Sequence, residues 1–210
     1  MSHARGNGTV EQAKPDPFEL LEEELHGAGY DLAGGAWARL KAECSVVEFP
    51  RRAEIFPIGI IPREILFVAS GVAAATFLAE DGTVYIYRFF EPGHLCTAIS
   101  SAWRHEPTAD AIVAATEVRG LLIPLETWKR HYSREGLLGD YFREKLIETL
   151  LFDKDIILTK TSKSTEAAYS LLEVQQPEVL RQVPQKLVAQ FLGLTPEGMS
   201  RFLRNREKAR

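Results

Sequence analysis

"QKLVAQFLGLTPEGMSRFL", residues 185–203, predicts two short helices joined by a tight turn. Apolar residues recur at helical spacing as far as Leu192, and a second helix is expected from Pro196, with Thr195 as its N-cap. Gly193 stands at the corner, where a residue without a side chain lets the backbone turn sharply. The stretch therefore predicts a helix-turn-helix, in which two helices cross over a short turn.

The two faces of this helix pair differ in chemistry. The apolar residues that should be buried where the helices pack are Val188, Leu192, Leu194, Met199 and Phe202, with the small Ala189 at the point of contact. The residues left facing outward are Thr195, Pro196, Glu197, Ser200, Arg201 and Arg204. A polar, partly basic outer face on a helix-turn-helix is the surface that such motifs present to the major groove of DNA.

The charge of the chain is distributed unevenly. Residues 181–210 hold seven Lys and Arg against two Glu, whereas the whole chain has 25 Lys and Arg against 29 Asp and Glu. Neutralisation of phosphates by Lys and Arg supplies most non-specific affinity for DNA, so a basic segment on an acidic body favours DNA binding. A basic amphipathic helical hairpin with no such role is the alternative.

The overall composition is that of an ordinary soluble protein, with 210 residues of which 45% are hydrophobic. The longest uncharged run, residues 65–79, is too short to cross a bilayer, and residues 1–17 lack a secretory signal and predict a disordered extension. We therefore expect a cytoplasmic protein that does not insert in a membrane. Cys44 and Cys96 are the only cysteines, which favours buried neutral thiols over a disulfide framework or a thiolate metal site.

Hydrophobic periodicity predicts a first domain over residues 18–135. Residues 18–44 have helix-like spacing interrupted by glycines, and from Val46 to about Pro124 the pattern changes to short runs rich in Val, Ile, Phe and Tyr. The Asp81-Gly82 pair between two such runs predicts a hairpin with a type I′ turn. The expected fold class is α+β, with an antiparallel, jelly-roll-like β-roll.

Helical spacing returns after the strands. Residues 140–176 contain neither Gly nor Pro and predict a long helix, whose part over residues 136–162 has an apolar stripe too wide for one neighbour. We expect this part to pair with a second copy of the chain, and residues 163–210 to form the helix-turn-helix domain. The residues expected at the pairing surface are Ile147, Leu150, Lys154 and Ile157; packing of the stripe on its own domain is the alternative.

Residues 18–205 resemble the CRP/FNR family of transcription regulators in the order of a strand domain, a long helix and a helix-turn-helix. The skeleton Q-x-x-G-x-[ST]-x-E-x-x-x-R appears as Gln190, Gly193, Thr195, Glu197 and Arg201, while Pro196 and Gly198 depart from the family pattern. The resemblance implies that Glu197 and Arg201 read base edges, as their chemistry allows. It implies DNA, a second copy and RNA polymerase as partners. The expected DNA-contacting set is Gln185, Lys186, Thr195, Pro196, Glu197, Ser200, Arg201 and Arg204.

The strand domain departs from the cyclic-nucleotide-binding members of this family. In "PGHLCTAIS" His94 stands where we place the family's ribose-binding Glu, and "EPTADAI", residues 106–112, lacks the phosphate-binding Arg. A buried phosphate needs a cation, so a cyclic AMP response is not expected, unless Arg104 or His105 substitutes. The expected pocket, for an effector of unknown identity, consists of Gly93, His94, Leu95, Cys96, Thr97 and Thr108.

The sequence shows no sign of catalytic chemistry. No H-x-H cluster occurs in the strands, His94 has no second His at ligand spacing, and no nucleophile stands with a base. We therefore expect neither an enzyme nor a metal or other cofactor. Two functions remain: a dimeric DNA-binding regulator, or a ligand-binding or interaction module whose helix-turn-helix does not read DNA.

Overall fold

The computed structural model describes residues 15–29, 32, 35–132, 137–162 and 164–209. Most of the predicted N-terminal extension lies outside these residues. Its last residue, Pro17, already belongs to helix α1 (Pro17–Gly27), which Asp16 caps by accepting a hydrogen bond from the amide of Phe18.

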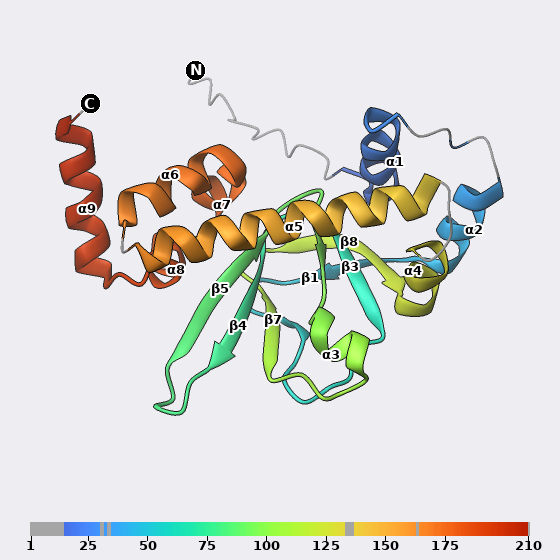
Figure 1. Ribbon diagram of the computed structural model, residues 1–210, viewed down its shortest axis with the longest axis horizontal. Helices are drawn as coiled ribbons and strands as arrows, with labels where there is room; N and C mark the ends of the chain where they lie inside the picture. The colour runs from blue at the N-terminus through green and yellow to red at the C-terminus, as the bar shows by residue number, and fades with distance from the viewer. Residues whose placement is uncertain (1–14, 30–31, 33–34, 133–136, 163, 210) are drawn as a thin grey trace, which may run out of the picture.

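Two antiparallel four-stranded sheets form the centre of the molecule (Figure 1). One sheet has the order β1 (Ser45–Phe49), β8 (Val118–Pro124), β3 (Glu64–Ser70) and β6 (Leu95–Cys96). The other has the order β2 (Glu54–Phe56), β7 (Asp110–Ala114), β4 (Ala73–Leu78) and β5 (Val84–Phe90). The predicted antiparallel β-roll is confirmed, although β2 and β6 are too short to give a periodic signal and were not expected.

The core of the roll lies between the sheets and is built by alternation along the strands. On β4, Ala73 and Ala75 face the interior with Leu66, Val68 and Phe90, whereas Ala74 faces the opposite side. Both faces of β4 are therefore buried over these residues, which explains its continuous apolar run. A strand that is covered on both faces requires another layer outside the roll.

The β4–β5 hairpin is confirmed, but its predicted turn type is wrong. A type I′ turn needs positive φ at both central residues, and of the pair only Gly82, at 83°, has it. The amide of Ala79 donates to the carbonyl of Thr83 (2.9 Å), and the Asp81 carboxylate accepts from the amide of Thr83 (2.9 Å). The carboxylate bond stabilises a longer loop in which only the glycine turns left-handed.

Helices cover the outer face of the β1–β8–β3–β6 sheet. These are α1, α2 (Gly35–Glu43), α4 (Leu125–Tyr132) and the start of α5 (Leu137–Thr161). They bury Leu25, Trp128 and Phe142 against Phe67 and Leu121 of the sheet. A further short helix, α3 (Ile99–Arg104), follows β6; neither α3 nor α4 was predicted.

The long apolar segment is two helices and not one. α5 ends at Thr161, and α6 (Thr165–Gln175) begins after Ser164, whose hydroxyl accepts a hydrogen bond from the amide of Ala167 (3.1 Å). The expectation of one helix over residues 140–176 is therefore wrong. Ser and Thr side chains can end a helix by bonding to the backbone themselves, so no Gly or Pro is needed.

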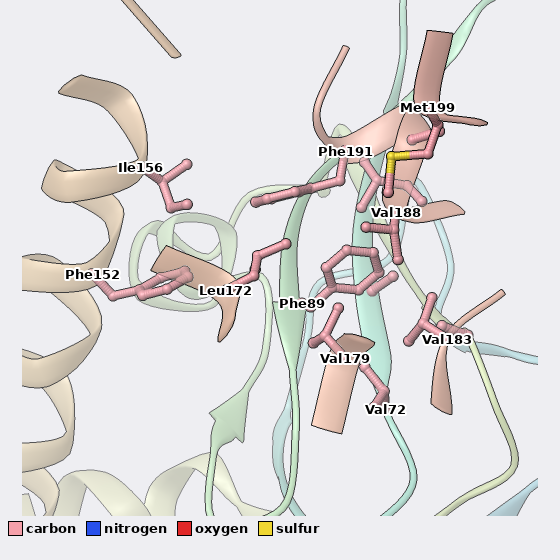
Figure 2. Packing of buried hydrophobic residues seen from close by; sticks show 14 residues of the cluster. Val72, Phe89, Phe152, Ile156, Leu172, Val179, Val183, Val188, Phe191 and Met199 are labelled. Carbon is pink, nitrogen blue, oxygen red and sulfur yellow. The ribbon is translucent and has the colours of Figure 1, made fainter. Parts of the chain in front are cut away.

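The C-terminal helices share a core with the outer face of the β2–β7–β4–β5 sheet. They are α6, α7 (Pro177–Gln182), α8 (Gln185–Phe191) and α9 (Pro196–Ala209). Figure 2 shows Phe89 of β5 among Val179, Val188 and Phe191, with Phe152 of α5 at the edge of the cluster. This is the second layer that β4 requires, and it fixes the helix-turn-helix on the roll.

Candidate nucleic-acid interface

The turn between α8 and α9 is closed by backbone hydrogen bonds. Gly193 takes a φ of 70°, its amide donates to Gln190 (3.1 Å), and the amide of Leu194 donates to the carbonyl of Ala189 (2.8 Å). This pair of bonds is the Schellman arrangement, which needs the left-handed residue that Gly supplies without strain. The predicted corner is therefore present, with α8 ending at Phe191.

Thr195 caps α9 as the sequence predicts. Its hydroxyl accepts a hydrogen bond from the amide of Gly198 at 3.0 Å. A Cβ on Gly198 would lie 3.3 Å from that hydroxyl oxygen, so the glycine leaves space for the cap. Pro196 and Gly198, the two residues that depart from the family pattern, thus lie within the first turn of α9, where Pro is well tolerated.

The inner face of α9 holds the helix to the rest of the domain. Met199 is 2% exposed, and the ring of Phe202 lies 5.3 Å from that of Tyr169 on α6. Arg206 donates to Glu166 (2.7 Å) and to Glu173, and stacks on Tyr169 with 4.7 Å from its guanidinium carbon to the ring centre. The hydrogen bonds that Arg206 donates to Glu173 and Glu166 raise its pKa. This arginine is therefore a structural residue.

The residues predicted to contact DNA lie on the first turn of α8 and from the N-cap of α9 along that helix. Exposed members of the predicted set are Gln185, Lys186, Thr195, Pro196, Glu197, Arg201 and Arg204. Ser200 is half-buried, and its hydroxyl donates to the carbonyl of Pro196 (3.1 Å). Glu197, Arg201 and Arg204 follow at intervals of four and three residues, which places them on one side of the helix.

The basic residues of residues 181–210 divide into two groups. Arg181 is paired with Glu178 one turn earlier on α7, and Arg206 is paired as described. Lys186, Arg201, Arg204 and Lys208 are exposed and, within the part of the chain that the structure describes, form no ion pair. Only this second group keeps its donors available for phosphates or bases.

Gln190 connects the helix-turn-helix to the roll. Its side-chain amide donates to the carbonyl of Val84 at the start of β5. Gln190 is the first residue of the Q-x-x-G-x-[ST]-x-E-x-x-x-R pattern. The sequence gave no indication that its side chain contacts the strand domain.

A small cavity lies between the roll and α5. It has a volume of about 160 Å³, and its polar lining includes Tyr87, Arg88, Lys145 and Asp153. The side chain of Arg88 on β5 is 5% exposed, donates to Asp153 on α5 and lies between the rings of Phe90 and Phe152. Burial lowers the pKa of Arg88 and raises that of Asp153. Sequence reasoning missed Arg88; its place within the aromatic run "YIYRFF" was the available signal.

The residues of the predicted ligand pocket do not share one cavity. Leu95 and Thr97 line the 160 Å³ cavity, while Gly93 and His94 line a neighbouring hollow of about 320 Å³ to which Leu95 also contributes. Cys96 is buried between the sheets, and Thr108 is 3% exposed, with its hydroxyl donating to the carbonyl of Asp110. The two candidate substitute cations, Arg104 and His105, are exposed and line neither space.

Cys96 is buried, whereas His94 and Cys44 are partly buried. Burial lowers the pKa of His94, whose Nδ1 lies 3.0 Å from the carbonyl oxygen of Glu91. Burial raises the pKa of Cys44 to about 12 and also raises that of Cys96. No group of three or more His, Cys, Asp or Glu among the described residues could hold a metal ion. None of the described helices is long and apolar enough to span a membrane.

The residues predicted for pairing lie on the side of α5 that faces away from the roll. Ile147, Leu150 and Ile157 are 57%, 59% and 62% exposed, and the side chain of Lys154 is 63% exposed. Phe152 and Ile156, on the opposite side of α5, are buried.

Several solved structures are similar in fold to this chain. FixK2 from Bradyrhizobium japonicum matches with a TM-score of 0.63 and 17% identity, over 79% of this chain and 85% of its own. The c-di-GMP responsive global regulator CLP of Xanthomonas campestris matches with a TM-score of 0.57 and 14% identity, over 83% and 92%. The sensor domain of the transcriptional regulator DNR from Pseudomonas aeruginosa matches with a TM-score of 0.51 and 16% identity, over 63% and 87%.

These structures belong to regulators of the CRP/FNR family, so the resemblance that the sequence predicts is confirmed at the level of the fold. At identities of 14–17% this likeness is one of fold. No protein-family model and no curated protein matches the sequence.

Proposed function

We propose that this protein is a dimeric, sequence-specific DNA-binding transcription regulator of the CRP/FNR type that does not respond to cyclic AMP. The observation that carries the proposal is the outer face of α9. Glu197, Arg201 and Arg204 are exposed there on one side of a capped recognition helix, and both arginines lack an ion-pair partner among the described residues. The global regulator CLP has this fold, and the transcriptional regulator DNR shares it over its sensor domain, which further supports the assignment.

Specificity is assigned to Glu197 and Arg201. Arg can donate two hydrogen bonds to guanine O6 and N7, and Glu can accept from cytosine N4. Lys186 and Arg204 are assigned to phosphates, because exposed cations at the edges of a recognition helix position it on the backbone. Contact with RNA polymerase and a cytoplasmic location are inferred from the resemblance.

Dimerisation is supported by the exposed side of α5. The apolar side chains there that are more than half exposed are Ile147, Leu150, Leu151, Ile157 and Leu158. Ile147, Leu150, Lys154 and Ile157 follow at intervals of three, four and three residues, which is the spacing of a coiled-coil seam. We infer that a second copy of the chain covers this side of α5, because a dimer also places two recognition helices on two half-sites.

The lack of a cyclic AMP response is supported by the cavity at α5. Its volume of about 160 Å³ is below the roughly 300–1,000 Å³ of pockets that hold drug-sized ligands. Its buried cation, Arg88, already pairs with Asp153. A cyclic nucleotide would have to displace that carboxylate and enlarge the cavity.

Selection of bound sequences from a random DNA pool tests the function. We expect one enriched palindromic site, and a preference for it that persists between 50 and 200 mM salt while non-specific binding falls steeply. Addition of cyclic AMP or cyclic GMP should leave the affinity unchanged. Absence of any sequence preference would favour the module whose helix-turn-helix does not read DNA.

Leu150→Glu tests the dimer. The substitution places a charge in the proposed apolar seam, so sedimentation should show a monomer, and operator affinity should fall because one half-site binds weakly. Val174→Glu is the matched control, since Val174 is 80% exposed on α6, outside the seam. If Leu150→Glu stays dimeric, the exposed apolar side of α5 does not form the dimer interface.

A further inference from the structure

A basic groove lies on the surface between the helix-turn-helix and the roll. It has a volume of about 620 Å³, and its floor includes Ala74 and Ile86 of the sheet and Leu187 of α8. Three cations line it: Arg51 and Arg52 from the turn between β1 and β2, and Lys186 from the first turn of α8. No Asp or Glu is among the lining residues. The groove thus presents one sign of charge, to which two domains contribute.

The three cations are available to a ligand. Arg51, Arg52 and Lys186 are exposed, and none of them has an ion-pair partner among the residues that the structure describes. Pro196, the first residue of the recognition helix, lines the same groove. The free cations of the roll therefore border the surface that is proposed to bind DNA.

The β1–β2 turn holds Arg52 in an unfavourable backbone conformation. Its φ is 73°, a region that L-residues other than Asn and Asp rarely adopt. The turn is closed by a hydrogen bond from the amide of Ala53 to Pro50 (3.0 Å), and it is tied to β7 by one from the amide of Arg52 to Ala114 (2.7 Å). A position that geometry suits to glycine is occupied by an exposed arginine, which is typical of a functional constraint.

We propose that Arg51 and Arg52 extend the DNA interface onto the roll, by binding phosphates of the backbone that flanks the bases read by α9. This inference rests on the proposed DNA-binding function. A duplex is too wide to enter the groove, but its phosphates can pass along the exposed rim. Lys186 then links the contacts of the helix-turn-helix with those of the roll, so that one strand of phosphates follows a continuous basic path.

Salt-dependent binding to the selected operator tests the proposal. In Arg51→Ala/Arg52→Ala, the slope of log Kobs against log salt should decrease by about 4, since each phosphate contact contributes about 0.9 and the dimer loses two contacts per protomer. Affinity should fall equally for the operator and for scrambled DNA, because phosphates carry no sequence information. On a duplex cut back to the two half-sites, the variant and the wild type should bind alike.

The control is Arg39→Ala/Arg63→Ala, which removes the same charge elsewhere. Arg39 lies on α2, over the other sheet, and Arg63 precedes β3 at the end where Glu64 pairs with Pro124. This variant should keep the wild-type slope. A slope that is unchanged in Arg51→Ala/Arg52→Ala, or reduced equally in the control, overturns the inference. A wild type without sequence preference would instead overturn the proposed function.

Arg52→Gly separates a DNA contact from a structural role. Glycine adopts the positive φ without strain, so the melting temperature should stay equal or rise while the salt slope decreases by about 2, one contact for each protomer of the dimer. Arg52→Lys keeps the charge and should keep the slope. If Arg52→Gly retains the full slope, Arg52 does not bind phosphate.

Discussion

Arg88, at the junction of the roll with α5, and Arg204, on the outer face of α9, carry the same charge in opposite surroundings. Arg88 is 4% exposed and reaches Asp153, whereas Arg204 is exposed and forms no ion pair among the described residues. A buried guanidinium loses its hydration and requires a carboxylate, while an exposed one keeps its donors free. Burial and pairing, and not the count of charges, therefore separate the arginines that hold the fold from those that can bind DNA.

Removal of the carboxylate at the buried site should have the largest effect. Asp153→Ala leaves Arg88 buried without its partner, and we expect a loss of about 3 kcal/mol in the free energy of unfolding, measured in urea. Asp155→Ala is the control, since among the described residues Asp155 pairs with the exposed Lys154 alone, at 3.6 Å, and the substitution should cost less than about 1 kcal/mol. Arg88→Met/Asp153→Leu should recover most of the loss. Equal effects of the two aspartates would show that Arg88 does not depend on its partner.

Substitution of the exposed cations of the helix-turn-helix should change DNA binding and leave stability unchanged. Arg201→Ala should cost about 2 kcal/mol on the selected operator and relax the preference at one base pair of each half-site. Lys186→Ala should weaken binding to all sequences alike. Both variants should unfold at the same urea concentration as the wild type. Full sequence preference in Arg201→Ala would mean that α9 does not read the bases through this residue.

Glu91, a buried acid between the roll and the helix-turn-helix, extends the comparison of buried and exposed charges to a carboxylate. Glu91 is 8% exposed and accepts hydrogen bonds from the amides of Glu178 (3.1 Å) and Val179 (3.3 Å) at the start of α7. Burial nevertheless raises the pKa of Glu91 to about 7.

The native state therefore binds a proton more tightly than the unfolded chain between the ordinary Glu pKa and 7. Stability should fall by about 1–2 kcal/mol as pH rises through this window. Glu91→Gln keeps an acceptor for both amides without the charge, so it should remove that fall and be more stable than the wild type at pH 8. Parallel urea profiles of the two proteins from pH 4.5 to 8 would contradict the assignment.

The smallest effects are expected at two arginines that lie close together on α9, so each serves as the control for the other. Arg206→Ala loses the ion pairs with Glu166 and Glu173 and should lower the free energy of unfolding by about 1 kcal/mol. Arg204→Ala should leave stability unchanged and decrease the salt slope of DNA binding by about 2, one phosphate contact for each protomer of the dimer. The reverse result would mean that the assigned roles of these neighbours are exchanged.

The sequence was most informative where the cause of a structure is local. The left-handed corner at Gly193 and the cap at Thr195 follow from residue type and spacing, and both are present. The hairpin at Asp81-Gly82 was predicted for the same reason, but its turn type was not, because a side-chain bond to Thr83 stabilises a longer loop. The end of α5 was missed because hydroxyl side chains can end a helix without a Gly or Pro signal.

The sequence by itself determined the order of roll, long helix and helix-turn-helix, since periodicity and turn chemistry act over a few residues. Only the tertiary structure decided which cations are buried and which are free. Arg88 meets Asp153 across 65 residues, and Arg206 meets Glu173 across 33. Arg52 and Lys186 border one groove although β-strands and helices separate them in the chain. Such pairings depend on which surfaces the packed sheets and helices bring together, and residue spacing carries no information about that.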